Sequence, residues 1–149
     1  MIDESLVVLD SPLDNKASII EFLSEKAKRL NYLENKDNYL EAVNHREAEF
    51  STAVGFDVSI PHGKSVEVRT PFVCFMRTKD QIQWDEDGNS VRLVFLLGVP
   101  EEQKSKLHLK ILAEISRRLM DEQFRAELIN GDKQSILALL NNIENNIIK

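Results

Sequence analysis

The chain of 149 residues has the length of one ordinary domain, and its 42% of hydrophobic residues can bury a core. Its 25 acidic residues outnumber its 19 basic ones, and a net charge of -6 argues against nucleic acid as a partner, because a phosphate backbone would be repelled. A single cysteine, Cys74, excludes an intramolecular disulfide. The chain begins without a basic segment and a long apolar stretch, and the apolar run 94–99 is too short to span a bilayer. We therefore expect one cytoplasmic domain over residues 1–149.

The first third of the chain predicts a strand followed by two helices. Residues 6–9 form a short apolar run that ends in a turn. After Asp14, a candidate N-cap, apolar residues recur at helical spacing and predict an amphipathic helix. A second helix is predicted over residues 37–48, and its last turns carry His45 and Arg46.

The middle of the chain predicts strands. β-Branched and aromatic residues gather at 58–60, 72–76 and 91–97, separated by residues that favour turns. The polar tract 85–89 contains Asp-Gly, which suits a tight connection between antiparallel strands. We therefore expect a hairpin at this tract.

The pattern becomes helical again after Pro100, where apolar residues recur at helical spacing and predict two or three helices. Gly131 separates the last two as a helix-ending residue, and the Asn-rich tail from Asn141 is expected to fray. Helices and strands in this order predict an α/β sandwich around one sheet, with the strand order left open.

His62 is the strongest candidate for chemistry among the three histidines. It lies in Ile60-Pro61-His62-Gly63-Lys64, directly after a predicted strand and between a residue that restricts the backbone and one that frees it. The sequence therefore places this imidazole on a loop at a strand end, where α/β folds commonly present reactive groups.

The other two histidines lie on predicted helices. His108 falls within the apolar arc of its helix, in the first turn, where unpaired N–H groups favour an anion. From position alone it is either a pocket wall or a half-buried histidine bonded to backbone. His45 is interpreted as a surface histidine near a helix end.

Other sites that these residues could suggest lack a required member. Gly63-Lys64-Ser65 imitates a phosphate-binding P-loop, but that motif needs glycine where the chain has Val58. The histidines are scattered, and no spacing typical of metal ligands is present. Cys74 lies within an apolar run and is expected to be a buried core residue and not a nucleophile.

Two segments together carry a family resemblance. Arg46–Thr52 with Gly55, followed by Val58–Lys64, resembles the signature of fructose/mannitol-type enzyme IIA domains of the sugar phosphotransferase system. The resemblance extends over nearly the whole chain and includes Leu107–Leu112. It implies a single-domain α/β sandwich with a mixed central sheet flanked by helices.

The resemblance also implies roles for three residues and for two partners. His62 corresponds to the phosphoryl acceptor, modified at its tele nitrogen, while Arg46 and His108 correspond to residues that lie beside it. Phosphorylated HPr would donate to His62, and His62 would pass the group to a cysteine of an enzyme IIB. No metal or cofactor is implied, and any membrane association would be peripheral, through a permease.

Transport of a fructose-like sugar is the main expectation, and the regulatory, nitrogen-type enzyme IIA is the alternative. A non-catalytic interaction module is disfavoured by the intact trio of Arg46, His62 and His108. Exchange between partners predicts brief complexes, a flat apolar rim around His62 and no small-molecule cavity.

The acceptor loop departs from the family pattern at two positions. Asp57 stands where the family often has glycine, and Ser59 stands where it often has alanine. Because Asp tolerates the left-handed backbone conformation better than most residues, Asp57 is expected to fit the loop while adding negative charge near the site.

Overall fold

The computed structural model describes residues 1–101 and 106–148, apart from the side chains of Lys64, His108 and Ile148. Within these ranges, no helix has the length and apolar character needed to cross a membrane. The elements, in chain order, are η1 (Glu4–Leu6), β1 (Val7–Ser11), α1 (Lys16–Arg29), α2 (Lys36–Glu49), β2 (Ala53–Gly55), β3 (Val58–Ser59), β4 (His62–Ser65), β5 (Phe72–Gln83), β6 (Ser90–Pro100), α3 (Leu107–Arg118), α4 (Glu122–Asn130) and α5 (Lys133–Ile148).

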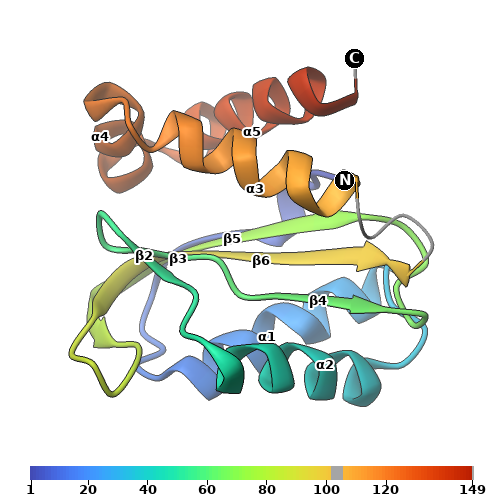
Figure 1. The fold of residues 1–149 in the computed structure, drawn as a ribbon. Helices are drawn as coiled ribbons and strands as arrows, with labels where there is room; N and C mark the ends of the chain where they lie inside the picture. The colour runs from blue at the N-terminus through green and yellow to red at the C-terminus, as the bar shows by residue number, and fades with distance from the viewer. Residues whose placement is uncertain (102–105, 149) are drawn as a thin grey trace.

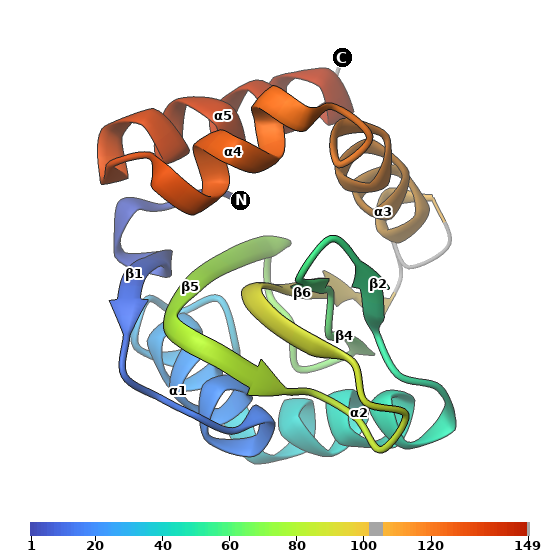
Figure 2. The ribbon, with the colours of Figure 1, turned by 90° about the vertical axis from the view of Figure 1, so that its left-hand side faces the viewer.

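The described strands form one mixed sheet between two layers of helices (Figures 1 and 2). The strand order is β1-β5-β6-β3-β2, with β4 also paired to β6. β5 and β6 form an antiparallel hairpin, as predicted, whereas β1 joins β5 and both β3 and β4 join β6 in parallel. α1 and α2 cover one face, and α3, α4 and α5 cover the other. This confirms the predicted mixed sheet flanked by helices.

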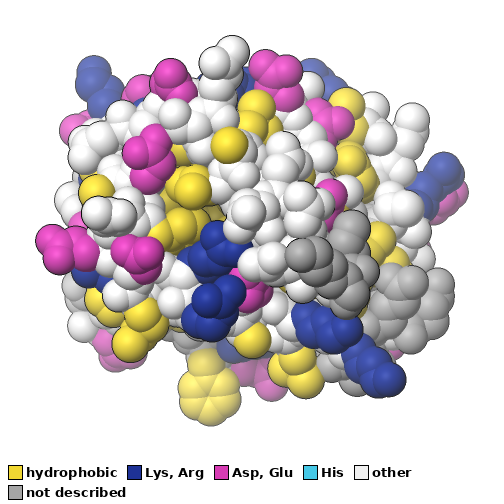
Figure 3. Space-filling view, turned by 90° about the horizontal axis from the view of Figure 1, so that it is seen from above, with side chains coloured by type: hydrophobic (Ala, Val, Ile, Leu, Met, Phe, Trp, Pro, Cys, Tyr) yellow, Lys and Arg dark blue, Asp and Glu magenta, His cyan; other side chains and the backbone are white. Residues whose placement is uncertain are grey.

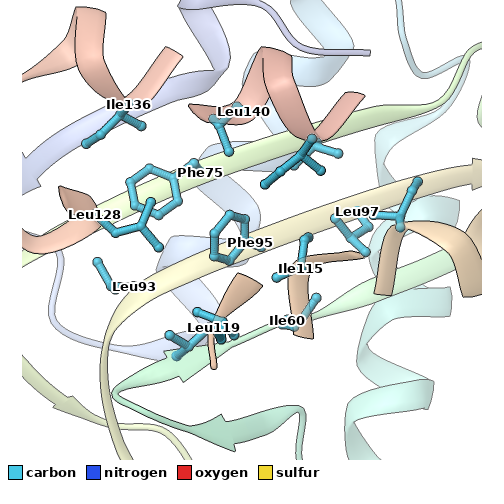
Figure 4. Close-up of a cluster of buried hydrophobic side chains, with 14 of the residues drawn as sticks. Ile60, Phe75, Leu93, Phe95, Leu97, Ile115, Leu119, Leu128, Ile136 and Leu140 are labelled. Carbon is cyan, nitrogen blue, oxygen red and sulfur yellow. The ribbon is translucent and has the colours of Figure 1, made fainter. Parts of the chain in front are cut away.

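The apolar runs of β5 and β6 are continuous because both faces of the sheet are covered. Successive side chains point to opposite faces, so Phe75 and Phe95 pack under α3–α5 while Cys74 and Leu96 pack over α1 and α2. Figure 4 shows the first of these clusters, in which the rings of Phe75 and Phe95 lie 5.0 Å apart. Cys74 is fully buried, as predicted, and burial raises the pKa of its thiol.

Figure 3 views the α3–α5 layer from outside, where acidic, basic and apolar side chains are interspersed.

Helix α5 is longer than the sequence predicted. It continues to Ile148, and Ile143 and Ile147 pack into the core, so the expected fraying from Asn141 is wrong. The apolar residues at helical spacing outweigh the Asn-rich composition, because burying each isoleucine contributes about 1.5–3 kcal/mol.

Helix boundaries follow the sequence signals closely, with one shift. α1 is capped by Asn15 and not by Asp14: the Asn15 Oδ1 accepts from the Ser18 N–H at 2.9 Å. α4 ends at Gly131, as predicted, although its φ of -70° is not left-handed. Glycine is needed there for space, since a Cβ would lie 2.5 Å from the Glu127 carbonyl oxygen.

Candidate functional site

His62 is the first residue of β4, a short strand where the sequence predicted a loop. β4 pairs in parallel with the end of β6, where His62 lies opposite Leu97 and the Leu97 N–H donates to the Pro61 carbonyl at 3.0 Å. Gly63 lets α2 approach, because a Cβ there would lie 2.8 Å from Val43 Cγ2. His62 is therefore held between β6 and α2, and only 7% of its surface remains exposed.

The orientation of the His62 ring is set by its own backbone. Its Nδ1 lies 2.9 Å from the Ile60 carbonyl oxygen. Because a carbonyl can only accept, Nδ1 carries the proton, and in the neutral ring Nε2 is the nitrogen with the nucleophilic lone pair.

Arg46 lies in the last turn of α2, as the sequence predicted, and it lines the same cavity as His62. Its Nη1 donates to the carbonyl oxygen of Phe50, the C-cap residue, at 2.7 Å. A guanidinium has five N–H donors in a rigid fork, so this bond fixes the group and leaves donors for an anion.

The cavity has a volume of about 650 Å³ and lies between α2 and the segment that begins with β4. Most of its lining residues are polar or charged, but apolar atoms make up the larger part of its surface, so of the expected flat apolar rim only the flatness is contradicted. The expectation of no cavity is wrong, because α2 and the segment from His62 to Glu67 leave a hollow beside His62. The lining residues are Asn38, Glu41, Ala42, His45, Arg46, Glu49, His62, Gly63, Ser65, Val66 and Glu67.

His45 also lines this cavity, although the sequence predicted only a surface histidine near a helix end. The helical spacing contained the signal, because Asn38, Ala42, His45 and Glu49 recur at three or four residues and therefore share one face of α2. What the sequence did not reveal is that β4 lies against that face.

His108 is the second residue of α3, so its predicted place in the first turn of a helix is confirmed. Its side chain lies outside the described part of the structure. The proximity of its imidazole to His62 therefore stays a prediction.

The turn between β2 and β3 shows how Asp57 fits this chain. Gly55, Phe56 and Asp57 all have positive φ, and the value of 62° at Asp57 confirms the expected left-handed conformation. The Asp57 carbonyl accepts from the Leu93 N–H at 3.0 Å, which anchors the turn to β6. Among the described residues, Asp57 is not one of those that line the cavity, so its charge lies outside the site.

Comparison with known families gives a match over residues 1–143, to the model described as "Phosphoenolpyruvate-dependent sugar phosphotransferase system, EIIA 2". Among curated proteins, the chain is 36% identical over 137 residues to a PTS system fructose-specific EIIA component of Haloferax volcanii. That alignment covers 91% of this chain and 88% of the relative.

Two solved structures share the fold. Nitrogen regulatory protein IIA-Ntr from Neisseria meningitidis superposes with a TM-score of 0.83 at 28% identity, covering 93% of this chain and 94% of the other. Enzyme IIAMTL of Escherichia coli, solved in complex with phosphorylated enzyme IIBMTL, gives a TM-score of 0.79 at 21% identity, covering 95% and 98%. At that identity the second likeness concerns the fold alone.

Proposed function

We propose that this chain, which belongs to the EIIA 2 family of the phosphoenolpyruvate-dependent sugar phosphotransferase system, carries its phosphoryl group on Nε2 of His62. Family membership gives the chain a phosphoryl-carrier role in that system. The observation that carries the finer proposal is the 2.9 Å contact between His62 Nδ1 and the Ile60 carbonyl, which leaves Nε2 as the nucleophile.

The transfer is a pair of in-line displacements at phosphorus. The Nε2 lone pair attacks the phosphoryl group of phosphorylated HPr, the new N–P bond forms, and the donor's N–P bond breaks with its electron pair returning to the donor imidazole. In the second step a thiolate of enzyme IIB attacks, and the electron pair of the His62 N–P bond returns to Nε2. The proton stays on Nδ1, which donates it to the Ile60 carbonyl throughout, so no proton has to leave the ring.

Charge around His62 suits temporary storage of a phosphoryl group. Arg46 supplies donors and a permanent positive charge for the equatorial oxygens, on which charge resides in a loose transition state. Glu41, Glu49 and Glu67 line the same cavity and oppose a dianion. The opposing charges keep the phosphorylated state reactive, which a carrier requires. His108 would add a further N–H donor, in keeping with the family pattern.

The partners proposed here are phosphorylated HPr as donor and an enzyme IIB as acceptor, within a fructose-like transport system. The identity to a fructose-specific component supports the sugar class, and the family match supports an acceptor within the same phosphotransferase system. No metal or bound cofactor takes part in either displacement. The whole chain would act as one domain.

A regulatory role is the second candidate, supported by the likeness to nitrogen regulatory protein IIA-Ntr. The two roles differ in where the phosphoryl group goes. A carrier in transport passes it to a IIB, whereas a regulator retains it and changes its protein contacts. Incubating the labelled chain with a fructose-type IIB distinguishes them, because rapid loss of label to the IIB cysteine supports transport.

The proposal is tested by incubating the chain with phosphoenolpyruvate, enzyme I and HPr, then measuring an acid-labile phosphoryl group by mass spectrometry. We expect His62→Ala to abolish the label. Arg46→Ala and His108→Ala should slow transfer about 100-fold, as loss of one charge-stabilising donor does, without unfolding the chain. Arg29→Ala, in the last turn of α1 and outside the cavity lining, is the matched control and should keep the label. Labelling of His62→Ala at the parent level would contradict the assignment.

A further inference from the structure

Glu47 is a buried carboxylate that the phosphoryl-transfer scheme does not use. It lies next to Arg46 at the end of α2, and only 8% of its surface is exposed. Its Oε2 accepts from the Thr52 N–H at 3.1 Å and from Trp84 Nε1 at 3.2 Å, and its Oε1 accepts from the Thr52 hydroxyl. Lys16 Nζ lies 3.6 Å from Oε2. Because an unsatisfied buried carboxylate is costly, these donors define one position for the segment that follows α2.

Thr52 connects Glu47 to His62 through the backbone. While its N–H and hydroxyl are bound to Glu47, its carbonyl accepts from the Ile60 N–H at 3.0 Å. The Ile60 carbonyl in turn accepts from His62 Nδ1. Ile60, the residue whose carbonyl fixes the tautomer of His62, is therefore linked to Glu47 by two hydrogen bonds, through Thr52.

The same segment connects Glu47 to Arg46. The carbonyl that holds the Arg46 guanidinium belongs to Phe50, two residues before Thr52. The Phe50 side chain is 76% exposed, so burial of that ring does not hold the segment. The hydrogen bonds of Thr52 to Glu47, together with a 2.5 Å bond from the Ser51 hydroxyl to Asp85, are what fix its place.

We propose that Glu47 is a positioning residue for phosphoryl transfer. Through Thr52 it keeps the His62 proton on Nδ1 and holds the Arg46 guanidinium in place. This inference rests on the proposed carrier function. Glu47 itself touches neither phosphoryl group nor partner. Its contribution is preorganisation, since a displacement of about 1 Å at reacting groups can cost about 100-fold in rate.

The proposal predicts different transfer rates for two substitutions of Glu47. Glutamine can keep the network, because its oxygen accepts from the Thr52 N–H and Trp84 Nε1 while its amide donates to the Thr52 hydroxyl. Alanine removes every acceptor and frees the segment. We therefore expect Glu47→Gln to transfer within about 3-fold of the parent and Glu47→Ala to be about 10- to 100-fold slower.

The experiment combines two readouts on the whole chain. Nitrogen-15 NMR of the imidazoles, in the unphosphorylated protein, reports the tautomer of His62. Rapid-quench kinetics with phosphorylated HPr report the rate constant and the half-saturating donor concentration separately. Glu47→Ala should mix the two tautomers and lower the rate constant while leaving the half-saturating concentration within about 2-fold, because the docking surface is unchanged.

Trp84→Phe is the matched control, since it removes the Nε1–H bond to Glu47 and leaves both Thr52 bonds. It should keep the parent tautomer and rate. If it slows transfer as much as Glu47→Ala, or if folded Glu47→Ala keeps the parent tautomer and rate, the positioning role is wrong.

Two further outcomes are distinguishable. Should Glu47→Ala fail to fold, Glu47→Asp shortens the side chain by one methylene, so that its carboxylate no longer reaches Thr52, and should still mix the tautomers of His62. An unchanged parent tautomer in that variant overturns the proposal. Should the parent accept no label from phosphorylated HPr, the carrier function fails, while the NMR measurement still decides whether Glu47 orients the ring.

Discussion

Ser59 of β3 and His62 of β4 lie on two short strands that both pair with β6. His62 Nδ1 finds the Ile60 carbonyl, whereas the Ser59 hydroxyl, fully buried, has no hydrogen-bond partner among the described residues. A buried hydroxyl without a partner keeps its desolvation cost. Ser59 thus lowers stability without contributing a contact to the site.

We predict that Ser59→Ala stabilises the chain. The substitution removes the unpartnered oxygen and leaves a void no larger than that atom, so the free energy of unfolding should rise by about 1 kcal/mol. Urea denaturation measures the difference, and phosphoryl transfer should be unchanged because no bond to His62 is altered. A fall in the denaturation midpoint would mean that the hydroxyl has a stabilising partner.

Helix α2 assembles most of the site from a single element. One of its faces lines the cavity, and its C-terminus carries Arg46 and Glu47 side by side. These two neighbouring side chains have different surroundings: Arg46 borders the cavity, whereas Glu47 binds Thr52 and Trp84 in the interior. Gly63 permits the close contact with β4 that completes the arrangement.

On the opposite face of the sheet, Glu114 joins α3 to α5. Its carboxylate accepts from Arg117 at 2.7 Å, from Arg118 at 3.0 Å and from Asn146 of α5 at 3.0 Å. The Arg117 hydrogen bond, with those of Asn146 and Arg118, lowers the Glu114 pKa from 4.5 to about 2. The contacts of the charged form therefore stabilise the packing of α5 on α3.

We predict an acid-dependent loss of stability from this residue. Because the folded pKa is below the unfolded one, the contribution is complete above about pH 5 and disappears as the pH falls toward 2. Glu114→Gln should cost about 1 kcal/mol at pH 7, after allowance for screening, and much less near pH 2. Denaturant titrations at several pH values measure this. Glu86→Gln, in the exposed β5–β6 connection, is the control. If Glu114→Gln lowers the free energy of unfolding equally at pH 7 and near pH 2, the prediction is wrong.

The two layers of the molecule share one sheet. Phe75 and Phe95 pack into the cluster under α3–α5. Their neighbours in sequence, Cys74 and Leu96, pack into the cluster over α1 and α2. A strand that loses one layer exposes its apolar face to water, which costs roughly 25 cal/mol for each Å² exposed. Neither helical layer can therefore leave without weakening the other.

We predict that the chain unfolds in a single cooperative transition. Trp84, the sole tryptophan of the sequence, is buried in the cluster over α1 and α2, so its fluorescence reports that layer. Far-ultraviolet circular dichroism reports all helices, including α3–α5. The two signals should give the same urea midpoint. A circular dichroism change that precedes the fluorescence change would show that α3–α5 unfold separately.

Local patterns predicted much of this molecule because their causes are local. The spacing of apolar residues gave α2 to within about one residue at each end, and the polar tract 85–89 gave the β5–β6 hairpin. β4 was missed because His62–Ser65 has no apolar alternation; it is a strand only because β6 supplies hydrogen bonds. His45 was missed because β4 lies beside its face of α2 only in the folded chain, and Glu47 was missed because its partner Trp84 is 37 residues away.

The sequence by itself determined most of the elements, their order, the α/β class, and the position of the Pro-His segment that we propose as the phosphoryl acceptor. These follow from helix and strand periodicity and from backbone restrictions, which act over a few residues. The tertiary structure alone decided the parallel pairing of β4 with β6, the cavity beside Arg46, and the burial of Glu47 against Trp84, 37 residues away. Such contacts form only where the free energy of burial and of hydrogen bonding favours one packing of the whole chain.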